Sequence, residues 1–288
     1  MTRRSLTTFL MVAPAVGVLL LLYAGGLITA LLQSFGYAPL YGLTDWTLAP
    51  YRGLFSSPSF WRSFGLTFYY ALVPTLLSLA GGTYLALLLR RSFKFKRFFS
   101  LVYKLPLVVP YIVGVALTVL LWSNGGLVAR FLHALGFIET TRDFPRVLYS
   151  HAGLGIMLVY VWKQLPFATV IILSTLTGLD DDLPRAARTL GATARQAFWR
   201  VTLPQLLPGI VAASLILFAY NFGAFEVPFL LGAGFPSTLP VEAWRAFDDA
   251  DYSRRLSAMA IVMLLSAVSA VVLGVYLWLY RRYGLQGR

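Results

Sequence analysis

Residues 183–209, LPRAARTLGATARQAFWRVTLPQLLPG, interrupt a chain whose flanking stretches are almost entirely apolar. The segment contains four arginines, five alanines and no acidic residue. Arginine is costly to place in the hydrocarbon of a bilayer, so a segment of this composition lies outside it and separates two membrane-spanning stretches. What it contacts there depends on the order of its residues and on the rest of the chain.

The whole chain has the composition of a membrane protein. Of its 288 residues, 58% are hydrophobic and 12% are charged, and the mean hydropathy is +0.73. The first apolar run is longer than the core of a signal peptide, which favours a retained helix. We therefore predict an all-α membrane protein with six transmembrane helices. Each needs ~20 apolar residues, and six stretches with at most one charge provide them: 5–44, 63–89, 105–129, 147–179, 201–241 and 256–280.

Basic residues are distributed unevenly about these spans. Six spans put both termini on one side, which then carries fifteen Lys and Arg residues against eight on the other side. By the positive-inside rule both termini are cytoplasmic, and residues 36–62, 124–150 and 232–255 lie outside. The net charge of +13 therefore reflects topology, and nucleic-acid binding is not expected.

The outer loops also have interpretable patterns. Residues 34–63 are rich in Pro, Gly and aromatic residues, which indicates an ordered loop with Tyr and Trp anchors at the membrane interface. A short amphipathic helix on the outer surface is predicted by the spacing of Leu127, Phe131, Leu135 and Ile138.

Motifs for catalysis are missing from the sequence. There is no H-E-x-x-H, G-x-S-x-G or G-x-x-x-x-G-K-[ST] pattern, and there is no cysteine. The consecutive carboxylates Asp180, Asp181 and Asp182 precede a helix start, where negative charge favours the positive end of the helix dipole. That role is favoured over a metal site, so we expect neither an enzyme nor a metal centre in this chain.

The segment 183–209 has the pattern of two short helices joined by a turn. Asp182 and Pro184 are typical of a helix start, and Gly191 is typical of a helix end. Thr193 and Gln196 have the spacing of a capping box, which opens a second helix through residue 200 and is closed by Leu-Pro at 203–204. Small apolar residues on one face and arginines on another fit either anionic lipid or a protein partner.

The order of these residues resembles a known signature. Ala186-Ala187, Gly191 and Leu203-Pro204 reproduce the spacing of the loop Glu-Ala-Ala, three residues, Gly, nine residues, Ile, one residue, Leu-Pro. That loop is found in permease subunits of binding-protein-dependent type I ABC importers, and Val201 stands where the family has Ile. The run FWRVTLPQLLPGI is also close to the family's entry into the fifth span. The resemblance covers roughly residues 60–280.

The resemblance implies that this loop is a coupling helix inserted into a cleft on a cytoplasmic ATPase subunit. Arg185 replaces the family glutamate and Leu190 replaces the common aspartate, so the glutamate's polar contact cannot be carried over. The candidate coupling residues are Arg185, Ala186, Ala187, Leu190, Gly191, Ala192, Arg195, Leu203 and Pro204.

Ionisable and polar residues inside the spans form a second candidate site. Lys163 lies about halfway along span four, and Glu226 lies toward the outer end of span five. Charges at such depth face a cavity or a partner. They either line a translocation path or pair with each other and fix helix packing. The path candidates are Lys163, Gln164, Tyr220, Asn221 and Glu226.

The expected architecture is six transmembrane helices with a cytoplasmic helix-turn-helix between spans four and five. Residues 1–62 form the first helix and outer loop, and residues 63–288 form the permease core. The resemblance implies a bacterial inner-membrane importer with two ATPase subunits, a second homologous or identical permease and an extracytoplasmic binding protein. ATP and Mg belong to the ATPase, and no cofactor is expected on this chain.

Within the family, the run from EVPFLLGAG onward is most similar to the polyamine, ferric-iron, thiamine and phosphonate branch. The sugar and glycerophosphodiester branch is second. Two alternatives to the importer stay open: an ATP-independent secondary transporter or channel, which predicts inverted repeats that we do not find, and a membrane scaffold, which leaves the loop spacing unexplained.

Overall fold

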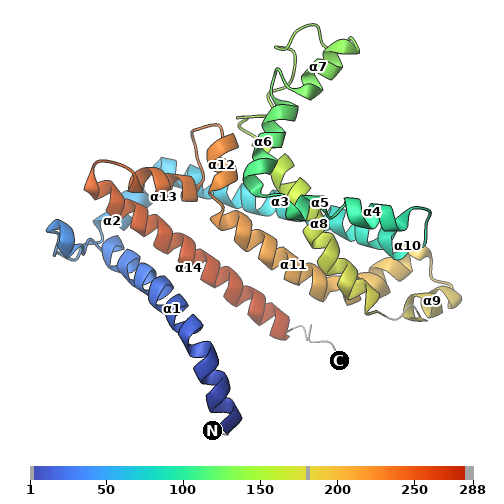
Figure 1. The fold of residues 1–288 in the computed structure, drawn as a ribbon, viewed down its shortest axis with the longest axis horizontal. Helices are drawn as coiled ribbons and strands as arrows, with labels where there is room; N and C mark the ends of the chain where they lie inside the picture. Colours follow the sequence, from blue (N-terminus) through green and yellow to red (C-terminus); the bar gives the residue numbers. More distant parts are fainter. Residues whose placement is uncertain (1–2, 180–181, 283–288) are drawn as a thin grey trace. The chain divides into compact units, whose positions relative to one another are not determined.

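The structure is a computed structural model that describes residues 3–179 and 182–282. The regular elements within that range are helices (Figure 1), which confirms the predicted all-α class. Six described segments are long and apolar enough to cross a membrane, as the composition predicts: Met11–Ser34, Pro58–Arg90, Tyr111–Ala134, Leu154–Thr177, Ala194–Gly223 and Tyr252–Trp278.

The chain divides into two compact units, and the first comprises residues 1–61 and 239–267. Its predicted ordered loop is confirmed, because aromatic side chains tie it together. Tyr37 stacks on Trp46 with ring centroids 5.1 Å apart, and the Tyr51 hydroxyl donates to Ser34 Oγ at 2.9 Å. This unit contains α1 (Arg3–Ser34), η1 (Pro39–Tyr41), α2 (Ala49–Ser56), α13 (Leu239–Phe247) and the beginning of α14 (Tyr252–Arg282).

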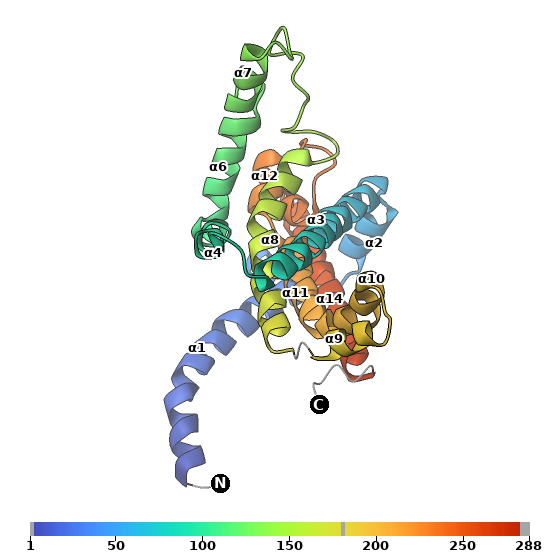
Figure 2. The ribbon, with the colours of Figure 1, turned by 90° about the vertical axis from the view of Figure 1, so that its right-hand side faces the viewer.

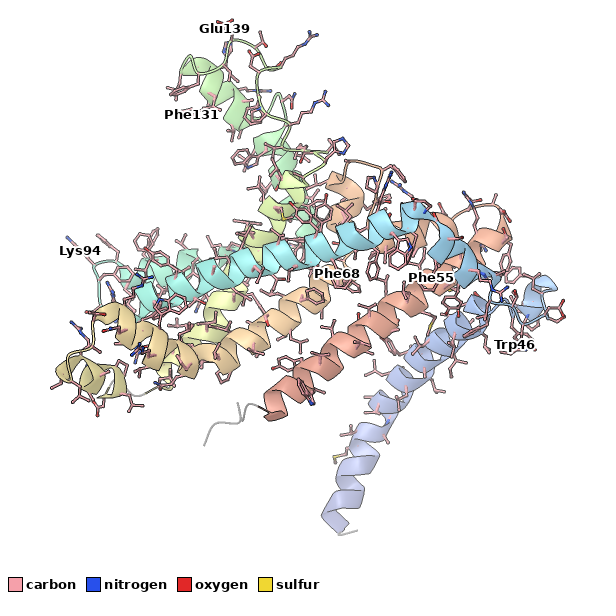
Figure 3. All side chains as sticks on the ribbon, turned by 180° about the vertical axis from the view of Figure 1, so that it is seen from behind. Trp46, Phe55, Phe68, Lys94, Phe131 and Glu139 are labelled. Atoms are coloured by element: carbon pink, nitrogen blue, oxygen red, sulfur yellow. The ribbon has the colours of Figure 1, made fainter. Side chains whose placement is uncertain are left out.

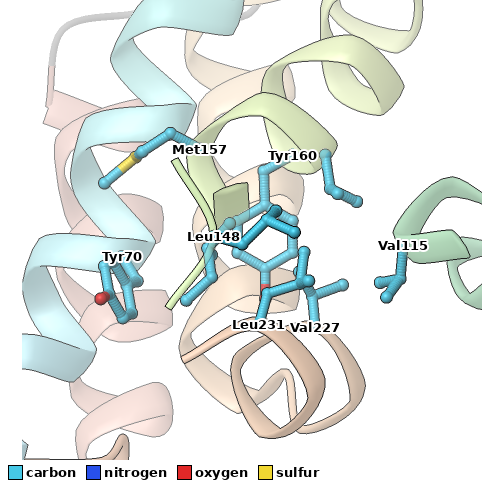
Figure 4. Packing of buried hydrophobic residues seen from close by; sticks show 9 residues of the cluster. Tyr70, Val115, Leu148, Met157, Tyr160, Val227 and Leu231 are labelled. Carbon is cyan, nitrogen blue, oxygen red and sulfur yellow. The ribbon is translucent and has the colours of Figure 1, made fainter. Parts of the chain in front are cut away.

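The second unit, residues 62–238 and 268–288, is built around α8 (Leu154–Thr177). Two clusters of buried side chains line this helix. One packs α8 against α3 and α11, and the other (Figure 4) packs it against α3, α6 and α12. The remaining elements are α3 (Pro58–Arg90), which begins in the first unit, α4 (Lys96–Val102), α5 (Leu105–Val108), α6 (Tyr111–Trp122), α7 (Leu127–Ala134), α9 (Asp182–Thr189), α10 (Ala194–Ala197), η2 (Phe198–Thr202), α11 (Leu203–Gly223) and α12 (Glu226–Leu231).

Small residues let these helices approach closely, as is usual where lipid gives no hydrophobic drive for association. A Cβ built on Gly82 of α3 lies 2.8 Å from the Ala168 Cβ and 3.0 Å from the Thr169 backbone nitrogen of α8. A Cβ on Gly209 of α11 would collide with Thr175 Oγ1 of α8. The contacts of α8 with α3 and α11 therefore depend on glycine.

The third apolar stretch is broken by proline. Pro106 lies in the first turn of α5, and Pro110 caps α6, so this span begins at Tyr111. Helix α7 continues the direction of α6 in both views (Figures 1 and 2).

A short helix, α7, exists where the amphipathic helix was predicted, but it lies inside the third candidate span, Tyr111–Ala134, and not after it. Its buried side is Ala129, together with the partly buried Val128 and Leu132, and Ile138 packs against the same cluster. Of the predicted apolar stripe, Leu127, Phe131 and Leu135 are exposed, and Ile138 alone packs against this cluster. Figure 3 shows Phe131 on this helix.

Candidate functional site

The predicted helix-turn-helix exists, and its first turn is a Schellman motif. Helix α9 starts with Asp182 in its first turn, which confirms the predicted helix start; Asp180 and Asp181 lie outside the described residues. Gly191 follows with φ +90°, and its N–H donates to the Arg188 carbonyl at 3.0 Å. The Ala192 N–H donates to the Ala187 carbonyl at 3.0 Å, which completes the motif.

The second helix begins with the predicted capping box. The Gln196 N–H donates to Thr193 Oγ1 at 3.2 Å, and the Thr193 N–H donates to Gln196 Oε1 at 2.9 Å. Leu203-Pro204 does not close this helix, contrary to the prediction. A π-helical turn, η2, connects α10 to α11 without a break, and its shifted hydrogen-bond register accommodates Pro204, which has no N–H to donate. The loop is thus continuous with the next spanning helix.

The surface of the loop combines apolar and cationic groups. No residue of α9 is buried, and Leu190 and Leu183 are 88% and 57% exposed. Arg185, Arg188, Arg195 and Arg200 are exposed as well. An exposed leucine at each end of α9, among arginines, is typical of a contact surface for another macromolecule.

Lys163 has a packing role that its position in the sequence did not reveal. Its ammonium group donates to the carbonyl oxygens of Pro106, at 2.6 Å, and of Val109, and it lies 4.9 Å from the centre of the Tyr111 ring. In a continuous helix the Pro106 carbonyl would accept from the N–H of residue 110, which is proline and has none. Lys163 therefore replaces the missing donor at the break between α5 and α6.

Replacing Lys163 with methionine is expected to lower the stability of the permease by roughly 2–4 kcal/mol, because two buried carbonyl groups lose their donor. Thermal unfolding of the purified protein measures this effect. Lys94→Met, at an exposed position, is the matched control and should leave the unfolding temperature unchanged. Equal unfolding temperatures for Lys163→Met and the unsubstituted protein would rule out this role.

Gln164 and Asn221 form a buried amide pair. Gln164 Nε2 donates to Asn221 Oδ1 at 2.5 Å, and Asn221 Nδ2 donates to Gln164 Oε1 at 3.1 Å and to Thr75 Oγ1 at 3.2 Å. Both amides are almost fully buried. The pair ties α8 to α11 and α3, which favours the packing interpretation for these two path candidates.

Tyr220 and Glu226 are more accessible. Tyr220 is 43% exposed and stacks on Tyr111 with centroids 4.9 Å apart, while Tyr111 also packs edge-on against Tyr160. Helix α11 ends at Gly223, so Glu226 lies at the start of the next helix, α12. Its side chain is exposed there. The prediction that Glu226 lies on the fifth spanning helix is therefore wrong, and it does not pair with Lys163 among the described residues.

Sequence reasoning missed the aromatic neighbours of these residues. Tyr160 lies three positions before Lys163 and four before Gln164, on the same face of α8. This helical spacing could have added Tyr160 to the candidates from the sequence. Tyr111 follows the break at Pro110, and no local pattern indicates its role. The structure thus separates the candidates into a buried group, Lys163, Gln164 and Asn221, and an accessible pair, Tyr220 and Glu226.

Comparison with known proteins gives consistent matches. The model of the family described as "Binding-protein-dependent transport system inner membrane component" matches residues 78–284. A probable ABC transporter permease of Sinorhizobium fredii is 32% identical over 225 residues, covering 72% of each chain. The molybdenum transport system permease of Mycobacterium tuberculosis is 31% identical over 237 residues, which is 80% of this chain and 83% of the relative.

A shorter match, 37% identity over 110 residues, links the chain to a spermidine/putrescine transport system permease of Salmonella typhimurium and covers 38% of this chain and 37% of the relative. Among solved structures, a bacterial alginate ABC transporter in complex with an alginate-pentasaccharide-bound periplasmic protein matches with a TM-score of 0.81. The match covers 99% of this chain and 98% of that chain at 20% identity, and it shows the fold.

The family match and the curated relatives define the class of this protein as a transmembrane permease subunit of an ABC importer, and the alginate transporter shares its helical fold. The chain belongs to the family of binding-protein-dependent transport system inner membrane components. Its homologues are permease subunits, with the ATPase on a separate subunit.

Proposed function

We propose that this chain couples ATP hydrolysis on separate subunits to the import of a small polar solute delivered by a soluble binding protein. The observation that carries the proposal is the exposed helix-turn-helix, whose Gly191 adopts φ +90° at the signature spacing of the family. Insertion of the turn into a cleft on a partner protein explains why Leu190 is 88% exposed there.

The proposed complex contains two ATPase subunits that bind ATP and Mg, a second homologous or identical permease, and an extracytoplasmic binding protein. Family membership supports the first two partners, and the periplasmic protein bound to the alginate transporter supports the third. The division into residues 1–62 and a permease core, 63–288, stays a prediction.

The proposed mechanism is alternating access, and the π-helical turn supports a route for the motion. Because η2 connects α10 to α11, closing the ATPase dimer would move the loop and α11 together. The pair Gln164–Asn221 would transmit that movement to α8. The spans then open toward the binding protein.

We infer a solute of the polyamine, ferric-iron, thiamine or phosphonate class, with sugars and glycerophosphodiesters second. The match to the spermidine/putrescine permease gives this order of solute classes weak support, since it covers little more than a third of the chain. The match to the molybdenum permease adds an oxyanion to the solutes to be tested. Uptake by cells that carry or lack the complete operon, measured for spermidine, ferric iron, thiamine, a phosphonate and molybdate, identifies the class.

An ATP-independent secondary transporter or channel is the alternative function. In proteoliposomes that contain the complete complex and its binding protein, solute uptake requires internal ATP if the chain is an importer permease. Uptake driven by a solute or ion gradient without ATP would favour the alternative.

Both termini are proposed to be cytoplasmic, from the fifteen basic residues on that side. Reporter fusions at Gly53 and after Arg288 are expected to report opposite sides of the membrane. If both reporters were found on the same side of the membrane, the six-span topology would be contradicted.

Glu226→Gln is expected to reduce uptake about fivefold or more without changing assembly, because the carboxylate is exposed beside the half-exposed Tyr220 and the substitution removes its charge but little volume. Uptake of the identified solute and recovery of the assembled complex are the two measurements. Glu139→Gln, at an exposed loop position, is the matched control. Unchanged uptake by Glu226→Gln would remove this residue from the path, and lost assembly would indicate packing.

A further inference from the structure

A basic, aromatic segment joins α3 to α6, and neither the transport path nor the coupling loop uses it. We define it as residues 93–108, FKFKRFFSLVYKLPLV. No Asp or Glu occurs anywhere between residues 46 and 138. Since one span ends at Arg90 and the next begins at Tyr111, this segment lies where the chain leaves and re-enters the membrane.

The segment lines an open pocket. Its volume is about 950 Å³, and it lies along α4 and α5. None of the residues of α4 is buried, and Val108 of α5 is 85% exposed. Lys94, at the turn before α4, is labelled in Figure 3. The pocket is lined by three cationic side chains, Lys96, Arg97 and Lys104, and by apolar ones that include Phe93, Leu101 and Val108.

Those two kinds of lining match the two parts of a phospholipid. Lysine and arginine bind phosphate oxygens, and apolar side chains beside them cover the first part of an acyl chain. A free inorganic anion would bind the cationic side chains but leave the apolar side chains of the pocket exposed to water. No ion pair within the described residues neutralises Lys96, Arg97 or Lys104, so the charge of the pocket is available to a ligand.

We propose that this pocket binds one anionic phospholipid at the membrane surface. The negative headgroup lies against Lys96, Arg97 and Lys104, and its chains run along Leu101 and Val108 toward the hydrocarbon. A lipid in this place would hold α4 and α5 against the bilayer beside the break that Lys163 stabilises. The proposal goes beyond the proposed import function and depends on neither the solute nor the orientation of the chain.

Photo-cross-linking tests it on the purified importer complex in phosphatidylcholine nanodiscs containing a photoactivatable phosphatidylglycerol. We expect adducts on residues 93–108, displaced by unlabelled phosphatidylglycerol but not by extra phosphatidylcholine or inorganic phosphate. Each basic residue near an anionic surface contributes roughly fivefold in affinity. The triple variant Lys96→Gln/Arg97→Gln/Lys104→Gln should therefore bind the lipid about 100-fold more weakly.

Controls keep the result interpretable. The variant Lys96→Arg/Lys104→Arg retains the charges and should retain the adducts, while Arg142→Gln/Arg146→Gln removes charge elsewhere and should not change them. Equal labelling of the triple variant, displacement by phosphatidylcholine, or displacement by inorganic phosphate would each overturn the proposal. So would burial of the pocket by a partner subunit, which Ser100→Cys detects in this cysteine-free chain as failure to react with a maleimide when the complex is held in phosphatidylcholine alone, without anionic lipid.

Discussion

Replacing Gly191 with leucine is expected to uncouple transport while leaving the chain in the membrane. Gly191 has φ +90°, where a side chain costs about 1 kcal/mol. A Cβ there meets no atom of this chain within 4 Å, so the fold has room for it. The bulk would instead enter the ATPase interface, where overpacking by about 2 kcal/mol corresponds to roughly 30-fold weaker binding.

The chain contains a matched control for that substitution. Gly136 has φ +75°, a Cβ there also meets no atom within 4 Å, and it ends α7 with the same pair of hydrogen bonds, Gly136 to His133 and Phe137 to Leu132. Gly136→Leu imposes the same backbone strain on a loop that is predicted to lie outside. Copurification of the ATPase and solute uptake should fall for Gly191→Leu only. Equal losses for both variants would mean that strain, not coupling, is responsible.

Gly82→Leu is expected to prevent assembly of the membrane domain. The first added carbon already lies 2.8 Å from Ala168 Cβ and 3.0 Å from the Thr169 backbone nitrogen, and backbone cannot yield as a flexible side chain does. Overpacking at this contact costs about 3 kcal/mol or more, so properly folded permease should fall about tenfold or more. Monodisperse protein recovered from membranes is the measurement.

A second glycine on the same helix is the control for that experiment. A Cβ on Gly65 of α3 meets nothing within 4 Å, and leucine favours a helix over glycine there. Gly65→Leu should therefore accumulate normally. Normal recovery of Gly82→Leu would contradict the close contact between α3 and α8.

Features set by local chemistry were predictable from the sequence. The six apolar stretches, the helix start at Asp182, the turn at Gly191 and the capping box of Thr193 and Gln196 each depend on a few neighbouring residues. The closure at Leu203-Pro204 was predicted wrongly because proline stops a regular α-helix. Here the π-helical turn shifts the hydrogen-bond register just before Pro204, and the helix continues.

Long-range contacts were not predictable in the same way. Lys163 and Glu226 were the two ionised residues in apolar stretches, so pairing was a natural hypothesis. Lys163 instead donates to carbonyls 54 and 57 positions away. The break between α5 and α6 frees these carbonyls, and no local sequence pattern indicates which residue binds them. Glu226 was placed on the fifth span because the charge-poor run continues to residue 241, whereas the helix ends at Gly223.

The most direct test of the central claim is site-specific cross-linking from the turn of the helix-turn-helix. The chain has no cysteine, so a single cysteine in the variant Leu190→Cys can carry a photoactivatable probe in the complete importer complex. Our account predicts an adduct with the ATPase subunit from this exposed position, and none from the same probe on Leu135→Cys beside Gly136. Adducts formed only with lipid, or an ATPase subunit cross-linked equally from both positions, would contradict a coupling role for this loop.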